Sequence, residues 1–192
     1  MHPVIEHAAD GRLPEWAEAT PERRDHMVRV ADVMEGWAVE LGLDREQRRR
    51  WRAVAMLHDA LRDADPGRLR ERVPEFDDLP DGLLHGPAAA ARLESEGVDD
   101  RALLSAVRWH TLGHPELDRL GRALYIADFT EPGRSHQNAR LASLRERVPT
   151  ELQAVLLEVT AERVGLNLAD RYPLREPAVG FWNVLVEEAA DG

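Results

Sequence analysis

Apolar side chains recur every three or four residues along most of this chain, which is the spacing of one face of an α-helix. The first such stripe runs through Met27, Val30 and Met34, with Pro21 ahead of it and Gly42 behind it. Proline is favoured in the first turn of a helix and glycine just past its end. The pattern therefore predicts a helix that begins at Pro21 and ends before Gly42.

A second stripe follows the letters DREQ, where Gln47 stands three residues after Asp44 in the arrangement of a capping box. This stripe passes through Trp51 and Val54 and ends at His58. Further stripes with the same spacing predict helices over residues 85–96, 103–110, 117–128, 138–147, 150–166 and 181–186.

The segment over residues 63–82 is rich in Asp, Pro and Gly, and we expect it to be a loop with one short helix. The sequence has no alternating strand pattern, repeat or low-complexity tract, so the predicted fold class is all-α. We expect three parts: an N-terminal extension over residues 1–20, a helical core over residues 21–148, and C-terminal helices over residues 149–192 that pack on the same domain.

Composition and charge narrow the classes of partner. At 192 residues the chain is long enough to bury one substantial core, and it has no cysteine, which excludes disulfides and thiolate metal sites. Its net charge of −11 argues against nucleic acid or an anionic membrane surface as the main partner. All 25 basic residues are arginine, whose guanidinium suits a small phosphorylated ligand. Without a secretory leader or a membrane-spanning stretch, we expect a cytoplasmic protein.

Six ionisable residues stand out against the apolar stripes. Four of them continue a stripe where the spacing calls for an apolar side chain, one begins a helix, and one is the neighbour of a stripe residue. A single inward histidine is commonly just a hydrogen-bonded core residue, but several on separate helices are harder to satisfy without a ligand. The six are His26, His58, Asp59, His85, His110 and Asp128.

A metal is the simplest way to satisfy converging imidazoles and carboxylates in a core without cysteine. This set of ligands suits iron, manganese or zinc better than magnesium or calcium. Six candidate ligands exceed what one catalytic ion with an open coordination position needs, which favours two ions bridged by a carboxylate. The residues alone therefore predict a metal site.

The order of these residues resembles that of the HD-domain metal-dependent phosphohydrolases, in which a histidine precedes a His-Asp pair and an aspartate follows. Three further blocks make the resemblance more specific: HGPAAAA at residues 85–91, RWHTLGHPEL at 108–117 and YIADFTEPGR at 125–134. Together they resemble the bacterial YqeK-type HD proteins from about His26 to Arg140. The resemblance implies an HD-domain helical bundle with extra C-terminal helices.

The activity that this resemblance implies is symmetrical hydrolysis of the nucleotide diadenosine tetraphosphate to two molecules of ADP. It also implies two metal ions, generally iron with manganese or zinc as alternatives, held by the six residues, with Asp59 bridging the two ions. Ions held in this way would lower the pKa of bound water and supply a hydroxide nucleophile. Asp59 is thus the first catalytic candidate.

Substrate contacts are expected from residues around these ligands. Arg62 stands where the family usually has lysine, and we expect it to contact phosphate and to act in catalysis as a cation, because arginine does not donate protons at ordinary pH. The C-terminal helices lie outside the resemblance and are candidates for covering the pocket or forming a homodimer. The further candidates for substrate binding are Thr111, Gly113, His114, Arg134 and Arg140.

Three other interpretations stay open at this point. An HD-type nucleotidase or pyrophosphohydrolase would act on another nucleotide and release monophosphate or pyrophosphate. A non-catalytic regulator would keep the scaffold only to bind nucleotide or metal. A helical interaction protein would pair its inward histidines with carboxylates and would hold no metal.

Overall fold

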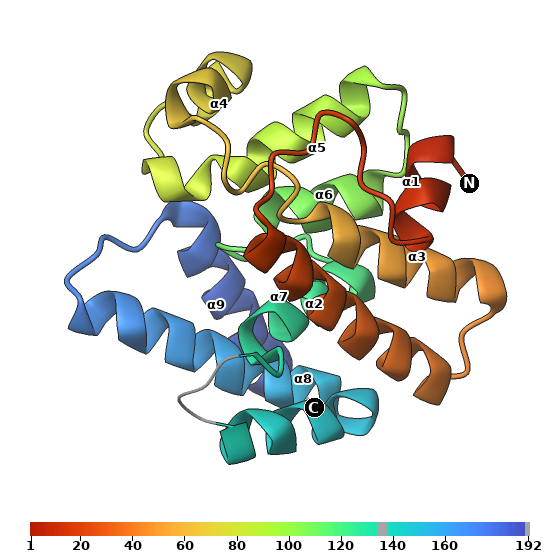
Figure 1. Ribbon diagram of the computed structural model, residues 1–192. Coiled ribbons are helices and arrows are strands. Elements are labelled where there is room, and N and C mark those ends of the chain that lie inside the picture. The colour runs from red at the N-terminus through yellow and green to blue at the C-terminus, as the bar shows by residue number, and fades with distance from the viewer. Residues whose placement is uncertain (134–137, 191–192) are drawn as a thin grey trace.

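The computed structural model describes residues 1–133 and 138–190, and these residues form helices, turns and loops with no strand among them. The all-α class is therefore confirmed (Figure 1). The α-helices are α1 (Pro3–Ala9), α2 (Pro21–Glu40), α3 (Arg45–Leu57), α4 (Pro66–Arg72), α5 (His85–Ser95), α6 (Arg101–Trp109), α7 (Arg119–Thr130), α8 (Asn138–Ala169) and α9 (Glu176–Ala190), with short 3-10 helices η1 (Pro74–Phe76) and η2 (Asp81–Leu83) between α4 and α5.

The starts of α2 and α3 follow the capping residues that the sequence provides. α2 begins at Pro21, where the Thr20 side chain accepts a hydrogen bond from the backbone N–H of Arg23. α3 begins behind a complete capping box, because the Gln47 N–H donates to Asp44 Oδ1 at 2.8 Å and the Asp44 N–H donates to Gln47 Oε1 at 3.3 Å. These caps fix which residues each helix turns inward.

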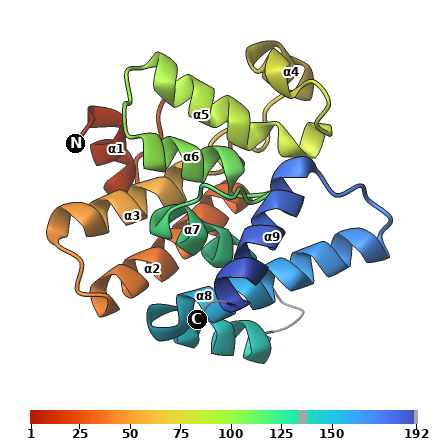
Figure 2. The same cartoon turned by 180° about the vertical axis from the view of Figure 1, so that it is seen from behind.

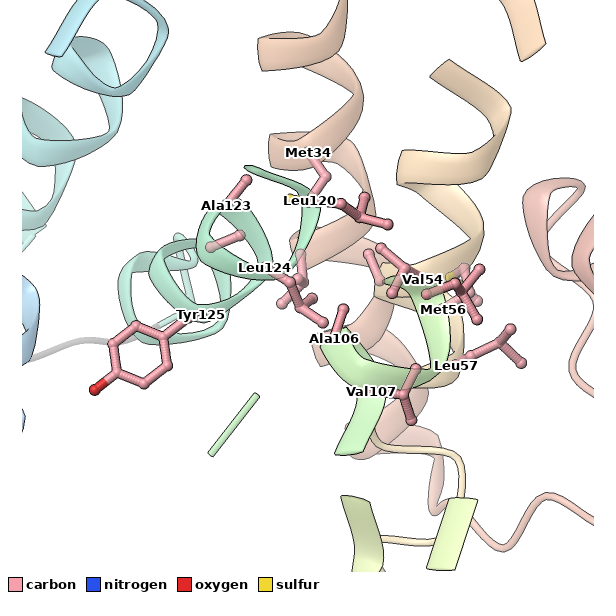
Figure 3. Close-up of a cluster of buried hydrophobic side chains, with 14 of the residues drawn as sticks. Met34, Val54, Met56, Leu57, Ala106, Val107, Leu120, Ala123, Leu124 and Tyr125 are labelled. Carbon is pink, nitrogen blue, oxygen red and sulfur yellow. The ribbon is translucent and has the colours of Figure 1, made fainter. Parts of the chain in front are cut away.

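Helix α7 lies in the middle of the bundle and packs on α2, α3, α6 and α8 (Figure 1). Its fully buried Leu124 belongs to one apolar cluster with Met34 of α2, Leu57 of α3 and Val107 of α6 (Figure 3). Burying a side chain of this size stabilises the fold by about 1.5–3 kcal/mol. Five of the six ionisable residues, all except His85 of α5, stand from one position to about two turns away from these apolar anchors, so the packing of the core sets their positions.

The N-terminal segment adds a short helix to this core. Ile5 and Ala8 of α1 are buried, and α1 packs along α3. At the surface, an ion pair of 2.8 Å between Arg49 Nη1 and Asp10 Oδ1 joins the two segments. The stretch expected to be an extension thus contributes apolar side chains to the core.

Helix α8 is bent near its middle, at Glu151 (φ −130°, ψ 34°), two residues after Pro149. The bend separates the two helices that the sequence predicts over residues 138–147 and 150–166, because proline disrupts the helical hydrogen bonds around it. α9 packs on α8 (Figure 2). Its fully buried Phe181 lies edge-on against Tyr125 of α7, with ring centroids 5.4 Å apart.

The connection between α8 and α9 covers residues 170–175 and reaches back toward the η2 segment in both views (Figures 1 and 2). There Arg175 Nη1 lies 3.6 Å from Asp78 Oδ2. The C-terminal helices therefore touch both α7 and the segment that precedes α5. None of the helices in the described ranges is long and apolar enough to cross a bilayer.

Candidate metal centre

The six ionisable residues predicted as ligands come from five helices and converge at one place. Four of these helices contribute a residue at or just beyond one of their ends, and α2 contributes a residue from its second turn. All except Asp128 are more than nine-tenths buried, and the Asp128 side chain is 13% exposed. His26 comes from α2, His58 and Asp59 follow α3, His85 begins α5, His110 follows α6, and Asp128 lies in the last turn of α7.

Asp59 occupies the centre of this cluster, with a side chain that is only 4% exposed. Its Oδ1 lies 3.1 Å from His85 Nε2 and 3.4 Å from His110 Nε2. Its Oδ2 lies 3.7 Å from His26 Nε2 and 3.6 Å from His58 Nε2. Each carboxylate oxygen of Asp59 therefore faces a different pair of imidazoles.

Two sets of three side chains are close enough together to hold an ion each. His26, His58 and Asp59 form one set, and Asp59 forms the other with His85 and His110; within each set the ligand atoms lie within 4.8 Å of one another. Beside the first set, Asp128 Oδ1 lies 3.3 Å from His26 Nε2. Asp59 is the member that the two sets share.

Outer contacts orient the imidazoles. In three of them, Nδ1 lies against the backbone carbonyl oxygen of the residue three positions earlier, at 2.6 Å in His58, 3.1 Å in His85 and 2.8 Å in His110. A carbonyl oxygen can only accept, so each Nδ1 must carry the proton. Each Nε2 then presents a lone pair toward Asp59, which is the arrangement of a metal-ligating histidine.

His26 achieves the same orientation with a carboxylate, because its Nδ1 lies 3.4 Å from Glu131 Oε1. Glu131 is buried and also accepts hydrogen bonds from Arg29 Nε at 2.6 Å and from the Gly133 N–H at 2.7 Å. Glu131 is not among the residues that the apolar pattern marks. Its only signal is its place three residues after Asp128, beyond the end of α7, where helical spacing no longer applies.

The cluster fits a metal because two of its buried imidazole nitrogen atoms are not satisfied by hydrogen bonds from the described residues. Nε2 of His26 and Nε2 of His58 are buried, and neither makes a hydrogen bond of good geometry within the described residues. Leaving such atoms unsatisfied in a core is costly. Imidazole nitrogen with carboxylate oxygen is a set of ligands that suits iron, manganese or zinc, and the residues therefore fit this group of metals.

The charges in the cluster suit a cation. Burial lowers the pKa of His58 to about 4, so this imidazole is neutral near pH 7. Burial alone would lower the pKa of His26, but Asp128 and Glu131 raise it to about 9. The raised pKa means that these carboxylates favour a positive charge at this position. Burial would raise the pKa of the Asp59 carboxyl, but its histidine neighbours hold the pKa well below the ordinary value, so the carboxylate is ionised.

Two arginines that the sequence analysis did not single out bind the carboxylates of the cluster. Arg23 Nη1 donates to Asp59 Oδ2 at 2.7 Å. Arg163 Nη2 donates to Asp128 Oδ2 at 2.8 Å, and its Nη1 donates to the Thr111 carbonyl at 2.8 Å. Arg23 stands three residues before His26 on α2, a spacing that places both on one face. Arg163 lies on α8, and nothing around it in the sequence marks it.

A pocket of about 770 Å³ opens onto the cluster. Asp59, His85, His110 and Asp128 line it, together with residues from the C-terminal helices. The predicted substrate residues Arg62 and Thr111 also line this pocket, and Arg62 Nη1 donates to the Gly82 carbonyl at 3.0 Å. The structure thus brings these two candidates together with the cluster.

Gly113 and His114 are not among the described residues that line the pocket. Gly113 is buried with φ +77°, and a Cβ at this position would overlap the Phe181 ring. Its lack of a side chain therefore makes room for Phe181, and the expected role of Gly113 in substrate binding stays a prediction. His114 stacks on Trp109 with ring centroids 4.7 Å apart.

The last two substrate candidates lie near the start of α8. Arg140 pairs with Glu162 and, within the described part of the chain, does not line the pocket. Arg134 lies outside the described residues. Neither residue therefore adds to the site as the structure describes it.

Known proteins resemble this chain in sequence. The family model for the HD domain matches residues 23–133. The "Bis(5'-nucleosyl)-tetraphosphatase, symmetrical" of Halalkalibacterium halodurans is 26% identical over 176 residues, which are 88% of this chain and 91% of that protein. The protein of the same name from Staphylococcus aureus is 32% identical over 127 residues, which are 62% of this chain and 63% of that protein.

A solved structure resembles this chain in fold. It is the crystal structure of a predicted HD superfamily hydrolase, described as involved in NAD metabolism, from Clostridium acetobutylicum. The TM-score is 0.77 with 24% sequence identity, over 88% of this chain and 90% of that chain. This similarity confirms the expected helical bundle.

Proposed function

This chain belongs to the HD-domain family, and we propose that it uses its histidine–aspartate cluster to hydrolyse diadenosine tetraphosphate into two molecules of ADP. The name shared by its relatives supports this substrate and the symmetrical cleavage. The observation that carries the proposal is the position of Asp59, whose two oxygens face two separate pairs of imidazoles. A carboxylate in that position is suited to bridge two ions.

In this proposal, His26, His58 and Asp128 would hold one ion, His85 and His110 would hold the other, and Asp59 would be a ligand common to both sets. We infer iron as the metal because the resemblance to the YqeK-type HD proteins implies it. Manganese and zinc are chemical alternatives, because imidazole and carboxylate ligands suit all three metals. When bound, such metals polarise phosphoryl oxygens and bring the pKa of bound water toward neutrality.

The chain's own residues then hold and neutralise the polyphosphate. Arg62 contacts phosphate, since within the described residues a single one of its donors is engaged, with the Gly82 carbonyl. Arg23 stays beside Asp59 and adds positive charge next to the cluster. The hydroxyl of Thr111, 3.0 Å from His110 Nε2, provides a further polar contact at the inner end of the pocket.

The overall reaction consumes one water molecule. The water oxygen forms a bond to one of the two central phosphorus atoms, and the bond from that phosphorus to the bridging oxygen breaks. The bridging oxygen leaves on the second ADP, whose developing negative charge the cations around the pocket stabilise. Each ADP gains a terminal phosphate oxygen in this step, and both protons of the water pass to solvent at a pH at which these oxygens are ionised.

Product analysis tests this proposal. The protein is incubated with diadenosine tetraphosphate and added manganese, or iron under reducing conditions, and the nucleotides are separated by chromatography. We expect ADP as the sole product. ATP together with AMP would contradict symmetrical cleavage. The absence of cleavage, with release of phosphate or pyrophosphate from ATP or guanosine polyphosphates in a parallel panel, would replace this substrate with another nucleotide.

A further inference from the structure

The pocket has an inner end at the metal cluster, lined by ionisable side chains, and an outer end, lined by apolar side chains that are open to solvent. Leu166 and Tyr172 line it, and they are 53% and 64% exposed. Pro173 and Ala178 line the same pocket. An exposed aromatic ring beside other apolar groups is not explained by the core, because these side chains remain accessible to solvent. The metal cluster does not use them either.

The end of α8 fixes the position of Tyr172. The Tyr172 N–H donates to the Asn167 carbonyl at 2.8 Å, and the Arg171 N–H donates to the Leu168 carbonyl at 3.2 Å. Arg171 has φ 60°, which is the left-handed conformation. These two hydrogen bonds and this φ form a Schellman motif, in which arginine occupies the position where glycine is usual. Because this conformation is unfavourable for a residue with a side chain, the motif holds Tyr172 at the pocket against a local backbone preference.

The same pocket contains two arginines whose charges no buried carboxylate in the described part of the chain neutralises. Arg62 donates to a backbone carbonyl, and Arg175 Nη1 lies 3.6 Å from Asp78, whose side chain is 76% exposed. An ion pair this open to water is weak. By contrast, Arg23 and Arg163 are each bound to a carboxylate of the cluster. Arg62 and Arg175 are therefore free to bind an anion.

We propose that the outer end of the pocket is a nucleoside-binding subsite, in which Tyr172 stacks on one base of the substrate and Arg175 contacts its phosphates. A ligand with a flat, apolar ring system and a polyanion matches both halves of this lining, and a nucleotide has both. The identity of the substrate rests on the proposed function. Stacking on an aromatic ring tolerates any base, so the subsite recognises a nucleobase without choosing among bases.

Equilibrium binding of ADP tests the subsite without requiring turnover. Isothermal titration with ADP is performed on the manganese-loaded wild type and on Tyr172→Ala, which should fold because the side chain is largely exposed. We expect the affinity of Tyr172→Ala for ADP to fall roughly tenfold, and Tyr172→Phe, which keeps the ring, to bind nearly as tightly as the wild type. Pyrophosphate, which has no base, should bind equally to all three proteins.

Leu168→Ala is the matched control and should keep the ADP affinity of the wild type. Leu168 is 60% exposed at the same helix end, but it does not line the pocket. Unchanged ADP affinity in Tyr172→Ala, or equal weakening of ADP and pyrophosphate, would overturn the subsite, as would a wild type that does not bind ADP. A wild type that binds ADP through Tyr172 but leaves diadenosine tetraphosphate intact would keep the subsite and refute the proposed function.

Discussion

Arg163 and Asp128 are joined by a hydrogen bond of 2.8 Å from Arg163 Nη2 to Asp128 Oδ2. The other oxygen of Asp128 lies 3.3 Å from His26 Nε2. Arg163 also lies over the Tyr125 ring, 4.2 Å from its centroid. Through this one side chain, a C-terminal helix outside the matched HD domain orients a residue of the candidate metal centre.

We therefore expect Arg163→Ala to lower metal affinity by roughly 10- to 100-fold, the usual effect of removing a group that orients a ligand. Competition with a fluorescent chelator measures this affinity. The metal affinity of Arg163→Lys should fall between those of the wild type and Arg163→Ala. Lysine keeps the charge, but it cannot donate to both Asp128 and the Thr111 carbonyl from one planar group. Arg147→Ala, which removes surface ion pairs of the same helix, should leave metal affinity unchanged. Equal affinities in all four proteins would show that Asp128 needs no such support.

Replacing Asp59 or His58 by alanine should abolish turnover of diadenosine tetraphosphate, with a loss of roughly a thousand-fold or more, because each change removes a proposed ligand. Bound metal should fall in the same variants while circular dichroism reports an intact helical fold. The exposed His7→Ala is the control and should keep both metal and activity. Full turnover in Asp59→Ala would remove the basis of the proposed mechanism.

Gly113→Ala should destabilise the protein by about 2 kcal/mol or more, because the new Cβ meets the Phe181 ring and φ +77° disfavours a side chain. Denaturant unfolding measures this loss. Gly165→Ala, in α8 with nothing near the added Cβ, should be neutral or slightly stabilising. If Gly113 instead makes room for phosphate, Gly113→Ala would keep its stability and raise the KM.

Asp100 gives the protein a pH-dependent contribution to stability away from the site. Burial would raise the pKa of its carboxyl, but Arg50 and the Leu103 N–H lower it. Arg50 Nε and Nη2 donate to the two oxygens at 2.5 Å and 2.6 Å. A carboxyl whose pKa is depressed in the folded state stabilises above the unfolded pKa of about 3.9, and this stabilisation disappears as the pH falls through the folded pKa.

Asp100→Asn should therefore lower the free energy of unfolding at pH 7 by about 1 kcal/mol. Asparagine still caps α6, so the variant isolates the charge. Denaturant titrations at several pH values should show the difference from wild type shrinking below pH 4. If the difference in the free energy of unfolding between the two proteins stayed constant down to pH 2, it would come from packing and not from the ion pair.

The sequence was sufficient to predict the α-helices from α2 onward and six of the residues in the cluster, whereas α1 lies in the stretch expected to be an extension. Caps such as Asp44 with Gln47 fixed helix starts, and an inward histidine at an apolar position is visible without any tertiary information. Residues such as His110 could be found because helical spacing alone says which way they face.

Residues that act through tertiary contacts could not be found in this way. Glu131 reaches Arg29 across 102 positions and Arg163 reaches Asp128 across 35, so no local pattern marks either pair. The packing of Gly113 against Phe181 could not be found for the same reason, because Phe181 lies 68 positions further along the chain, on α9.

The central claim is that Asp59 bridges two metal ions, and metal content per chain tests it most directly. Wild type and Asp59→Ala are reconstituted with manganese under reducing conditions, freed of loose metal, and measured by mass spectrometry of the elements. We expect about two ions per wild-type chain and a loss at both positions in Asp59→Ala, because each set of ligands shares that carboxylate. A folded, reconstituted wild type without metal, or an Asp59→Ala variant that keeps both ions, would contradict it.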